Sequence, residues 1–226
     1  MNIYFLVEGK RTERKVYPAW LAYLLPELKQ VHNYDEVNNN NYYLFSGEGY
    51  PSIIYEHLPN AIGDVCSQAN YNYLVVCLDA EENTVSSVKQ EIQYFLQSEK
   101  INTGNTQLFI IIQNRCIETW FLGNRKIYSR QPQTNRLLEY TRYYNVCVDC
   151  PELMGRYHHN THAQFHETYL KELFKAKNID YSKRNPGDVL KPYYLEQLLE
   201  RIQDKTHHLP SFQAFVDFCH MIKTKL

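Results

Sequence analysis

Apolar runs alternate with amphipathic stretches along the first half of the chain. Residues 3–7, 42–45, 73–78 and 108–112 are almost continuously apolar, as strands buried on both faces of a parallel sheet are. Between them, helical spacing of apolar positions predicts helices that follow Thr12, open at Pro51 and span residues 85–98. Strands that alternate with helices predict an α/β fold, with a parallel sheet built from right-handed crossovers and flanked by helices.

The pattern changes after Gly123. A locally basic stretch follows. Apolar residues then recur at helical spacing around residues 165–177, 193–204 and 212–223, and no further strand is predicted. We therefore expect an α/β core over residues 1–123 and a mainly helical C-terminal region over residues 124–226 that packs on the core.

Composition narrows the location and the partners of the protein. The chain has 226 residues with a formal net charge of -1, so it lacks the global basic charge of a protein that only coats nucleic acid. Six cysteines without secretory features indicate reduced thiols. The N-terminus lacks the h-region of a leader, and no stretch approaches the length of a membrane span. We expect a cytoplasmic protein with no membrane partner.

Acidic residues follow two of the predicted strands. Glu8 comes directly after the first strand, and Asp79 and Glu81 come directly after the third. Ligands of an open parallel sheet bind beyond the carboxyl ends of its strands, so these carboxylates converge if the two strands are neighbours. Like charges that close repel one another and favour a bound cation. Mg²⁺ or Mn²⁺, bound by Glu8, Asp79 and Glu81, would orient a phosphate and an attacking water. Helix capping is the ordinary role of each residue taken alone.

Short motifs in the same order resemble the Toprim family. Residues 8–13 (Glu-Gly-Lys-Arg-Thr-Glu) after a strand are similar to the first Toprim motif, and residues 79–81 (Asp-Ala-Glu) are similar to its Asp-x-Asp motif, with Glu81 in place of the second Asp. Residues 116–123 (Cys-Ile-Glu-Thr-Trp-Phe-Leu-Gly) and 211–215 (Ser-Phe-Gln-Ala-Phe) resemble segments of standalone Toprim proteins related to OLD nucleases of bacterial anti-phage defence systems.

The resemblance implies a Toprim-like Rossmannoid core and a hydrolase that cuts DNA or RNA with Mg²⁺ or Mn²⁺, an endonuclease rather than an exonuclease. It also implies an ATPase partner protein. Glu8, Asp79 and Glu81 would be the metal ligands, and Glu13 and Glu118 accessory ligands or acid/base groups. Glu118 can equally be a carboxylate at a helix N-terminus. From its place in a charged loop, Lys183 is a candidate to stabilise the transition state, although solvated loop charge is the commoner role.

A competing motif lies in the second half of the chain. Cys147 and Cys150, followed by His162 and His166, have a spacing close to that of a structural zinc site. Ordinary thiols and surface histidines are the other interpretation of the same residues. Two alternative functions remain: a Toprim-fold nucleic-acid-binding or regulatory subunit that does not cut, and a nucleic-acid-binding protein stabilised by zinc at these four residues.

Overall fold

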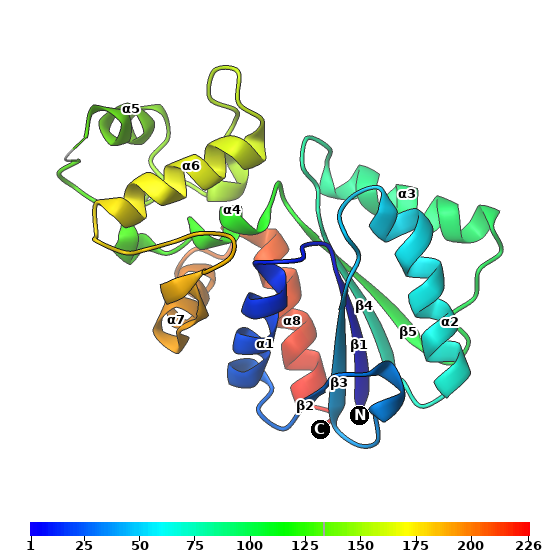
Figure 1. Cartoon of the computed structure of the whole chain (residues 1–226). Coiled ribbons are helices and arrows are strands. Elements are labelled where there is room, and N and C mark those ends of the chain that lie inside the picture. The colour runs from blue at the N-terminus through cyan, green and yellow to red at the C-terminus, as the bar shows by residue number, and fades with distance from the viewer. Residues whose placement is uncertain (133) are drawn as a thin grey trace. The chain divides into compact units, whose positions relative to one another are not determined.

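A five-stranded sheet forms the centre of the computed structural model, which describes residues 1–132 and 134–226 (Figure 1). The strand order is β2-β3-β1-β4-β5, and β1 pairs in parallel with both β3 and β4. Strand β5 pairs with β4 at the other edge of the sheet. Gln107 N donates to Asn72 O where both strands begin and Ala80 N donates to Gln113 O where both end, so β5 is parallel to β4. The strands are β1 (Asn2–Val7), β2 (Lys29–Val31), β3 (Asn41–Ser46), β4 (Tyr73–Asp79) and β5 (Gln107–Gln113).

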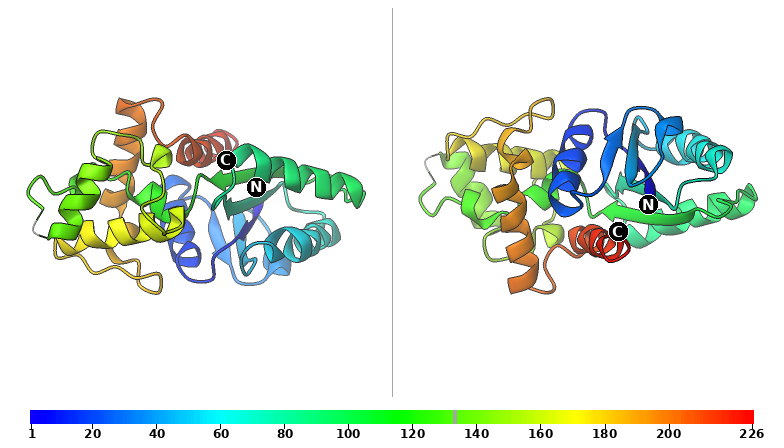
Figure 2. Two further views of the ribbon diagram at one scale, coloured as in Figure 1. Left: turned by 90° about the horizontal axis from the view of Figure 1, so that it is seen from above. Right: turned by 90° about the horizontal axis from the view of Figure 1, so that it is seen from below.

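Helices cover both faces of this sheet, with α2 and α3 on one side and α1 and the end of α8 on the other (Figures 1 and 2). Neighbouring residues of β1 point to opposite faces. The Tyr4 hydroxyl donates to Asp64 of α2 at 3.1 Å, whereas the Phe5 ring lies 6.1 Å from that of Phe218 in α8. The helices are α1 (Glu13–Leu24), α2 (Leu58–Gln68), α3 (Val85–Ser98), α4 (Ile117–Phe121), α5 (Asn135–Tyr143), α6 (His162–Lys175), α7 (Pro192–Asp204) and α8 (Pro210–Lys223).

The predicted α/β class, with a parallel sheet flanked by helices, is confirmed. The helix predicted over residues 85–98 has those bounds as α3, and every predicted strand is present within one residue at either end. The helix expected from Pro51 differs, because a π-helical turn over Ile53–His57 precedes α2. Two elements lack an apolar signal in the sequence: β2 is a short edge strand without a fully buried residue, and α5 buries only two side chains.

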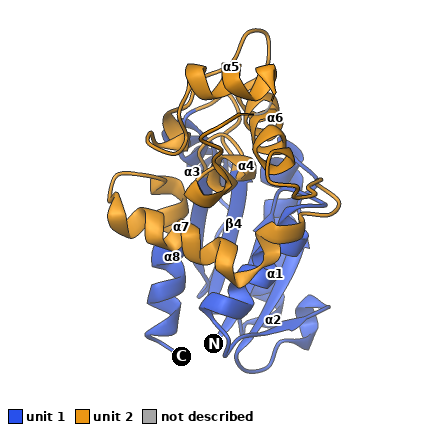
Figure 3. Cartoon of the chain, turned by 90° about the vertical axis from the view of Figure 1, so that its left-hand side faces the viewer, with its two compact units in different colours: residues 1–78, 84–112, 215–226 blue, residues 79–83, 113–214 orange. Residues whose placement is uncertain are grey.

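The chain divides into two compact units, each described here by itself (Figure 3). Unit 1 comprises residues 1–78, 84–112 and 215–226 and contains nearly all of the sheet; unit 2 comprises residues 79–83 and 113–214. This division does not coincide with the boundary expected at Gly123. The end of α8 belongs to unit 1 because Phe215 and Phe218 pack on Tyr17 and Phe5, a long-range contact that helical spacing in the sequence cannot indicate.

A buried arginine organises part of unit 2. Arg201 of α7 is fully buried, and its guanidinium donates to the carbonyl oxygens of Gly123, Val146 and Asp149 at 2.7–3.0 Å. Its Nε also donates to His208 Nδ1 at 3.2 Å. Burial lowers the pKa of Arg201 to about 10, so the side chain stays charged at neutral pH. One side chain thus links four separate segments of the helical unit.

Candidate functional site

In unit 1, Glu8 lies at the carboxyl end of β1, as the sequence predicts. Its backbone N–H continues the ladder by donating to Cys77 O of β4 at 3.0 Å. Its side chain is half-buried, and Oε1 accepts a hydrogen bond from Tyr50 N at 3.1 Å. A backbone donor from the loop after β3 therefore fixes the direction of the Glu8 carboxylate.

Glu13, the first residue of α1, folds back over Gly9. Only 7% of Glu13 is exposed, and a β-carbon at position 9 would collide with its carboxyl group. The glycine after Glu8 is therefore needed for the close approach of the second acidic side chain. The charge of Glu13 also acts on Cys77: burial, helped by this carboxylate, raises the pKa of the Cys77 thiol to about 12.

In unit 2, the loop after β4 is tied to the loop after β5. Glu81 N donates to Arg115 O at 2.9 Å, and Arg115 Nη1 donates to the carbonyl oxygens of Glu81 and Asn83 at 3.2 and 3.0 Å. Glu81 and Arg115 both have positive φ, 51° and 83°, a conformation that L residues rarely adopt without surrounding support. Arg115 thus holds the backbone that carries Glu81. An arginine after a strand is no signal by itself, so the sequence does not predict this role of Arg115.

Glu118 and Lys183, two of the predicted site residues, lie together in unit 2. Glu118 in α4 is only 1% exposed, and Lys183 Nζ lies 3.7 Å from its Oε1 and 3.4 Å from Glu167 Oε2. The hydroxyl of Tyr181 donates to the same Glu118 oxygen at 2.9 Å. The buried carboxylate therefore has a neutral donor and a cation beside it, as a buried charge requires. Tyr181 and Glu167 were not predicted, because only the fold brings their segments to Glu118.

The charges of this cluster shift several pKa values. Burial lowers the pKa of Lys183, but Glu118, Glu167 and Asp79 together raise it by more, so the net shift is upward and the ammonium stays protonated. Burial and the negative charges of Glu118 and Asp79 raise the pKa of the Cys116 thiol. Asp79 of β4 therefore contributes to the same negative potential as Glu118.

Two of the segments that resemble Toprim proteins, residues 116–123 and the start of residues 211–215, are in contact inside unit 2. Trp120 Nε1 donates to Ser211 Oγ at 2.7 Å, and the Trp120 and Phe212 rings are 5.4 Å apart. Ser211 Oγ in turn donates to the Glu152 carboxylate at 2.6 Å. Burial raises the pKa of Glu152. These contacts give both segments a structural role: they close the helical unit around a buried carboxylate.

Three of the four side chains of the zinc motif, those of His166, His162 and Cys150, have other partners. His166 is fully buried, its Nδ1 lying 2.7 Å from Thr119 Oγ1 and its Nε2 3.3 Å from Met154 O. His162 Nδ1 lies 2.9 Å from a Glu82 carboxylate oxygen, and Cys150 Sγ accepts from a backbone N–H. Cys147 is half-buried. The structure gives no support for a zinc site built from these four side chains.

Within residues 1–132 and 134–226, no group of three or more His, Cys, Asp or Glu side chains is arranged to hold a metal ion. A magnesium site does not require such a group, since Mg²⁺ keeps several waters and often binds one or two carboxylates plus substrate phosphates. The chain was also compared with protein-family models, curated proteins and solved structures. None of them matches. In the part of the chain that the structure describes, no helix is both long and apolar enough to cross a bilayer.

Proposed function

We propose that the protein is a metal-dependent phosphodiesterase that cuts DNA or RNA. One observation carries the proposal: Glu8 follows β1 and Asp79 ends β4, and these strands are parallel neighbours in the sheet (Figure 1). Both carboxylates thus belong to the carboxyl edge of a parallel sheet, where α/β proteins bind their ligands. Glu81 comes two residues after Asp79 on a backbone held by Arg115.

The donor set suits a hard divalent cation. One or two of the carboxylates of Glu8, Asp79 and Glu81 would bind each Mg²⁺ or Mn²⁺ ion, with water and substrate oxygens completing the coordination. When bound, such an ion neutralises charge on the phosphate and lowers the pKa of water. Lys183, kept protonated by Glu118 and Glu167, supplies a positive charge for the phosphate. Glu118 acts through Lys183, because its own carboxylate is buried.

The test is cleavage of circular and linear DNA and of RNA by the purified protein, with Mg²⁺, with Mn²⁺ and with EDTA. Cutting of circles would identify an endonuclease. We expect Glu8→Gln and Asp79→Asn to lower the rate about a hundredfold or more, while Glu99→Gln, an exposed glutamate after α3, keeps it. Equal cleavage by wild type and both site variants would refute the assignment.

A double-mutant cycle separates the roles of Glu118 and Lys183. If Glu118 acts by positioning the ammonium, Lys183→Met lowers the rate and the added substitution Glu118→Gln lowers it little further. Independent, multiplying losses would instead make Glu118 a separate acid or base. The single Glu118→Gln variant should also shift the pH profile, because it removes a carboxylate that raises the pKa of Lys183.

We also propose that the protein works beside an ATPase partner in defence against phage, a proposal supported only by the Toprim resemblance. Co-purification of a tagged chain from its native host, with and without ATP, tests the partner. Nucleic-acid binding without cutting under any metal condition would favour the non-cutting regulatory subunit instead.

A further inference from the structure

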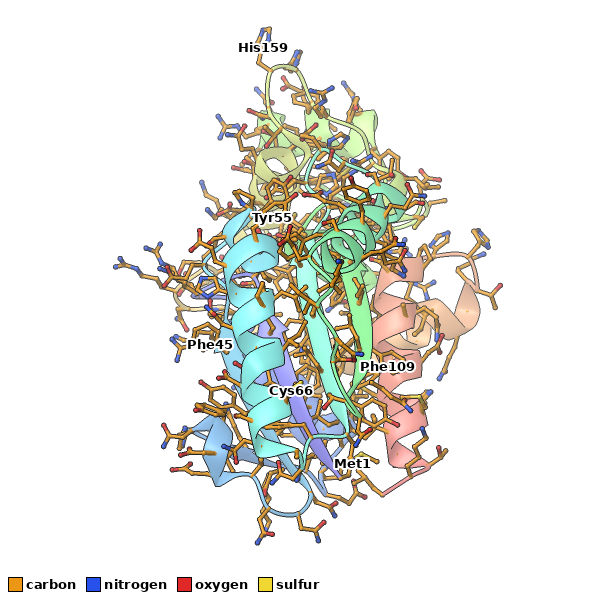
Figure 4. All side chains as sticks on the ribbon, turned by 90° about the vertical axis from the view of Figure 1, so that its right-hand side faces the viewer. Met1, Phe45, Tyr55, Cys66, Phe109 and His159 are labelled. Atoms are coloured by element: carbon orange, nitrogen blue, oxygen red, sulfur yellow. The ribbon has the colours of Figure 1, made fainter. Side chains whose placement is uncertain are left out.

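Unit 1 contains a polar cavity whose lining includes none of the candidate site residues. Its volume is about 290 Å³, and it lies between the start of α1 and the β2–β3 edge of the sheet. Phe45, labelled in Figure 4, forms part of its wall. The polar side chains around it are those of Lys10, Arg14, Gln30, His32, Tyr43, Ser46 and Glu48.

The lining is rich in groups that bind anions. Arg14, in the first turn of α1, is exposed and makes no ion pair among the residues that the structure describes. Burial and the charge of Asp64 raise the pKa of Tyr43, and the charge of Arg14, which lines the same cavity, lowers it. His32 adds an imidazole, and its own backbone N–H is already bound to Glu36 at 3.2 Å.

Lys10 and Glu48, which both line the cavity, form an ion pair with each other. Lys10 Nζ lies 2.8 Å from Glu48 Oε1, and both side chains are more than half exposed, at 57% and 54%. Such a pair contributes little to stability and exchanges partners readily. An anion in the cavity can therefore take Lys10 from Glu48, and Glu48 competes with that anion.

We propose that this cavity binds the phosphate monoester of a nucleotide. Arginine matches phosphate with paired N–H groups, lysine adds charge beside it, and histidine adds a ring nitrogen that can form a hydrogen bond. A monoester carries close to two negative charges at neutral pH, so it gains more from these cations than a mid-strand diester does. The volume lies at the lower end of the range for ligand pockets, which suits one nucleotide and not a longer stretch of strand.

The phosphate can belong to a free mononucleotide or to the end of a nucleic-acid strand. Calorimetric titration of the full chain in EDTA compares inorganic phosphate, a nucleoside 5′-monophosphate, and one short oligonucleotide with either a 5′-phosphate or a 5′-hydroxyl. Tighter binding of the 5′-phosphorylated strand than of the mononucleotide identifies a strand end. Equal or weaker binding of that strand identifies the free nucleotide.

Two variants should move the affinity in opposite directions. Arg14→Gln weakens binding of the preferred probe about tenfold or more, while Glu48→Gln strengthens it by releasing Lys10. The matched control Arg142→Gln, on an exposed position of α5 in unit 2, leaves it unchanged. No binding of any phosphate probe at millimolar concentration, or unaltered affinity in folded Arg14→Gln, would overturn the proposal.

This inference does not depend on the proposed phosphodiesterase activity. The titration needs neither a metal ion nor cleavage, so a protein that cuts nothing can still bind phosphate here. Conversely, cleavage that survives Arg14→Gln while phosphate binding is lost would leave both conclusions intact. Circular dichroism of each variant verifies that it is folded.

Discussion

Acid should destabilise unit 2 through one buried imidazole. His166 of α6 has no exposed surface, and its Nε2 lies 3.3 Å from the Met154 carbonyl oxygen, so Nε2 carries the proton. Nδ1 is then the acceptor, and the Thr119 hydroxyl donates to it at 2.7 Å. A second proton on Nδ1 would force the Thr119 hydroxyl to accept where it now donates, and would place a charge in the core. Burial lowers the pKa of His166 from 6.5 to about 3.

The sign follows from proton linkage. Above pH 6.5, His166 is neutral in both states and contributes no pH dependence. Below it, the unfolded chain takes up a proton that the folded chain refuses, so the free energy of unfolding falls as the pH drops toward 3. Each pH unit in this window costs about 1.4 kcal/mol, or about 2 kcal/mol by pH 5.

Urea unfolding at about pH 7.5 and about pH 5 measures this loss, with Trp120 fluorescence in a Trp20→Phe background as the reporter for unit 2. The His166→Gln variant keeps a donor for the Met154 carbonyl but cannot titrate, so its loss should be smaller by about 2 kcal/mol. The control His159→Gln changes an exposed loop residue (Figure 4) and should match the wild type. Equal losses in wild type and His166→Gln would refute the reasoning.

Four substitutions probe other positions by thermal or urea unfolding. Gly9→Ala should destabilise by about 1–3 kcal/mol because the new methyl group meets the Glu13 carboxyl, while Gly63→Ala, in an open helical position, should stabilise by roughly 0.5–1 kcal/mol. Arg201→Met should cost about 3 kcal/mol or more, because three carbonyl groups, those of Gly123 and Val146 in buried hydrogen bonds, lose their donor. Ser211→Ala should cost about 1–3 kcal/mol, because it removes the Oγ donor of a buried carboxylate and the acceptor of Trp120 Nε1. Unchanged stability in any destabilising variant would contradict the contact assigned to it.

The sheet could be predicted because strands buried on both faces must be apolar over their whole length. That requirement marks β1 and β4, whose residues are buried almost throughout. It does not extend to β2, which lies at the sheet edge and contributes Lys29 and Gln30 to solvent. Helix α5 was not predicted for a related reason. It buries only Leu137 and Tyr140, and two positions are too few to show the helical periodicity of apolar residues.

The candidate site could be predicted only as far as strand ends determine it. Glu8 and Asp79 have the expected places relative to β1 and β4. Their surroundings come from distant segments: Tyr50 orients Glu8, and Arg115 supports the backbone of Glu81. Neither contact has a signature at fixed spacing along the chain, so no reading of local pattern could have found it.

The asymmetry of the Glu118–Lys183 pair decides how its two members can act. Glu118 is 1% exposed and bound by Tyr181, whereas 46% of the Lys183 side chain is open to solvent. A carboxylate enclosed in this way cannot reach a substrate without unfolding α4, but the ammonium beside it can. Because Glu118 and Glu167 raise the pKa of Lys183, they also keep that accessible charge positive. In the proposed phosphodiesterase, Glu118 would therefore act as a positioning residue for Lys183, and contact with a phosphate would fall to the lysine.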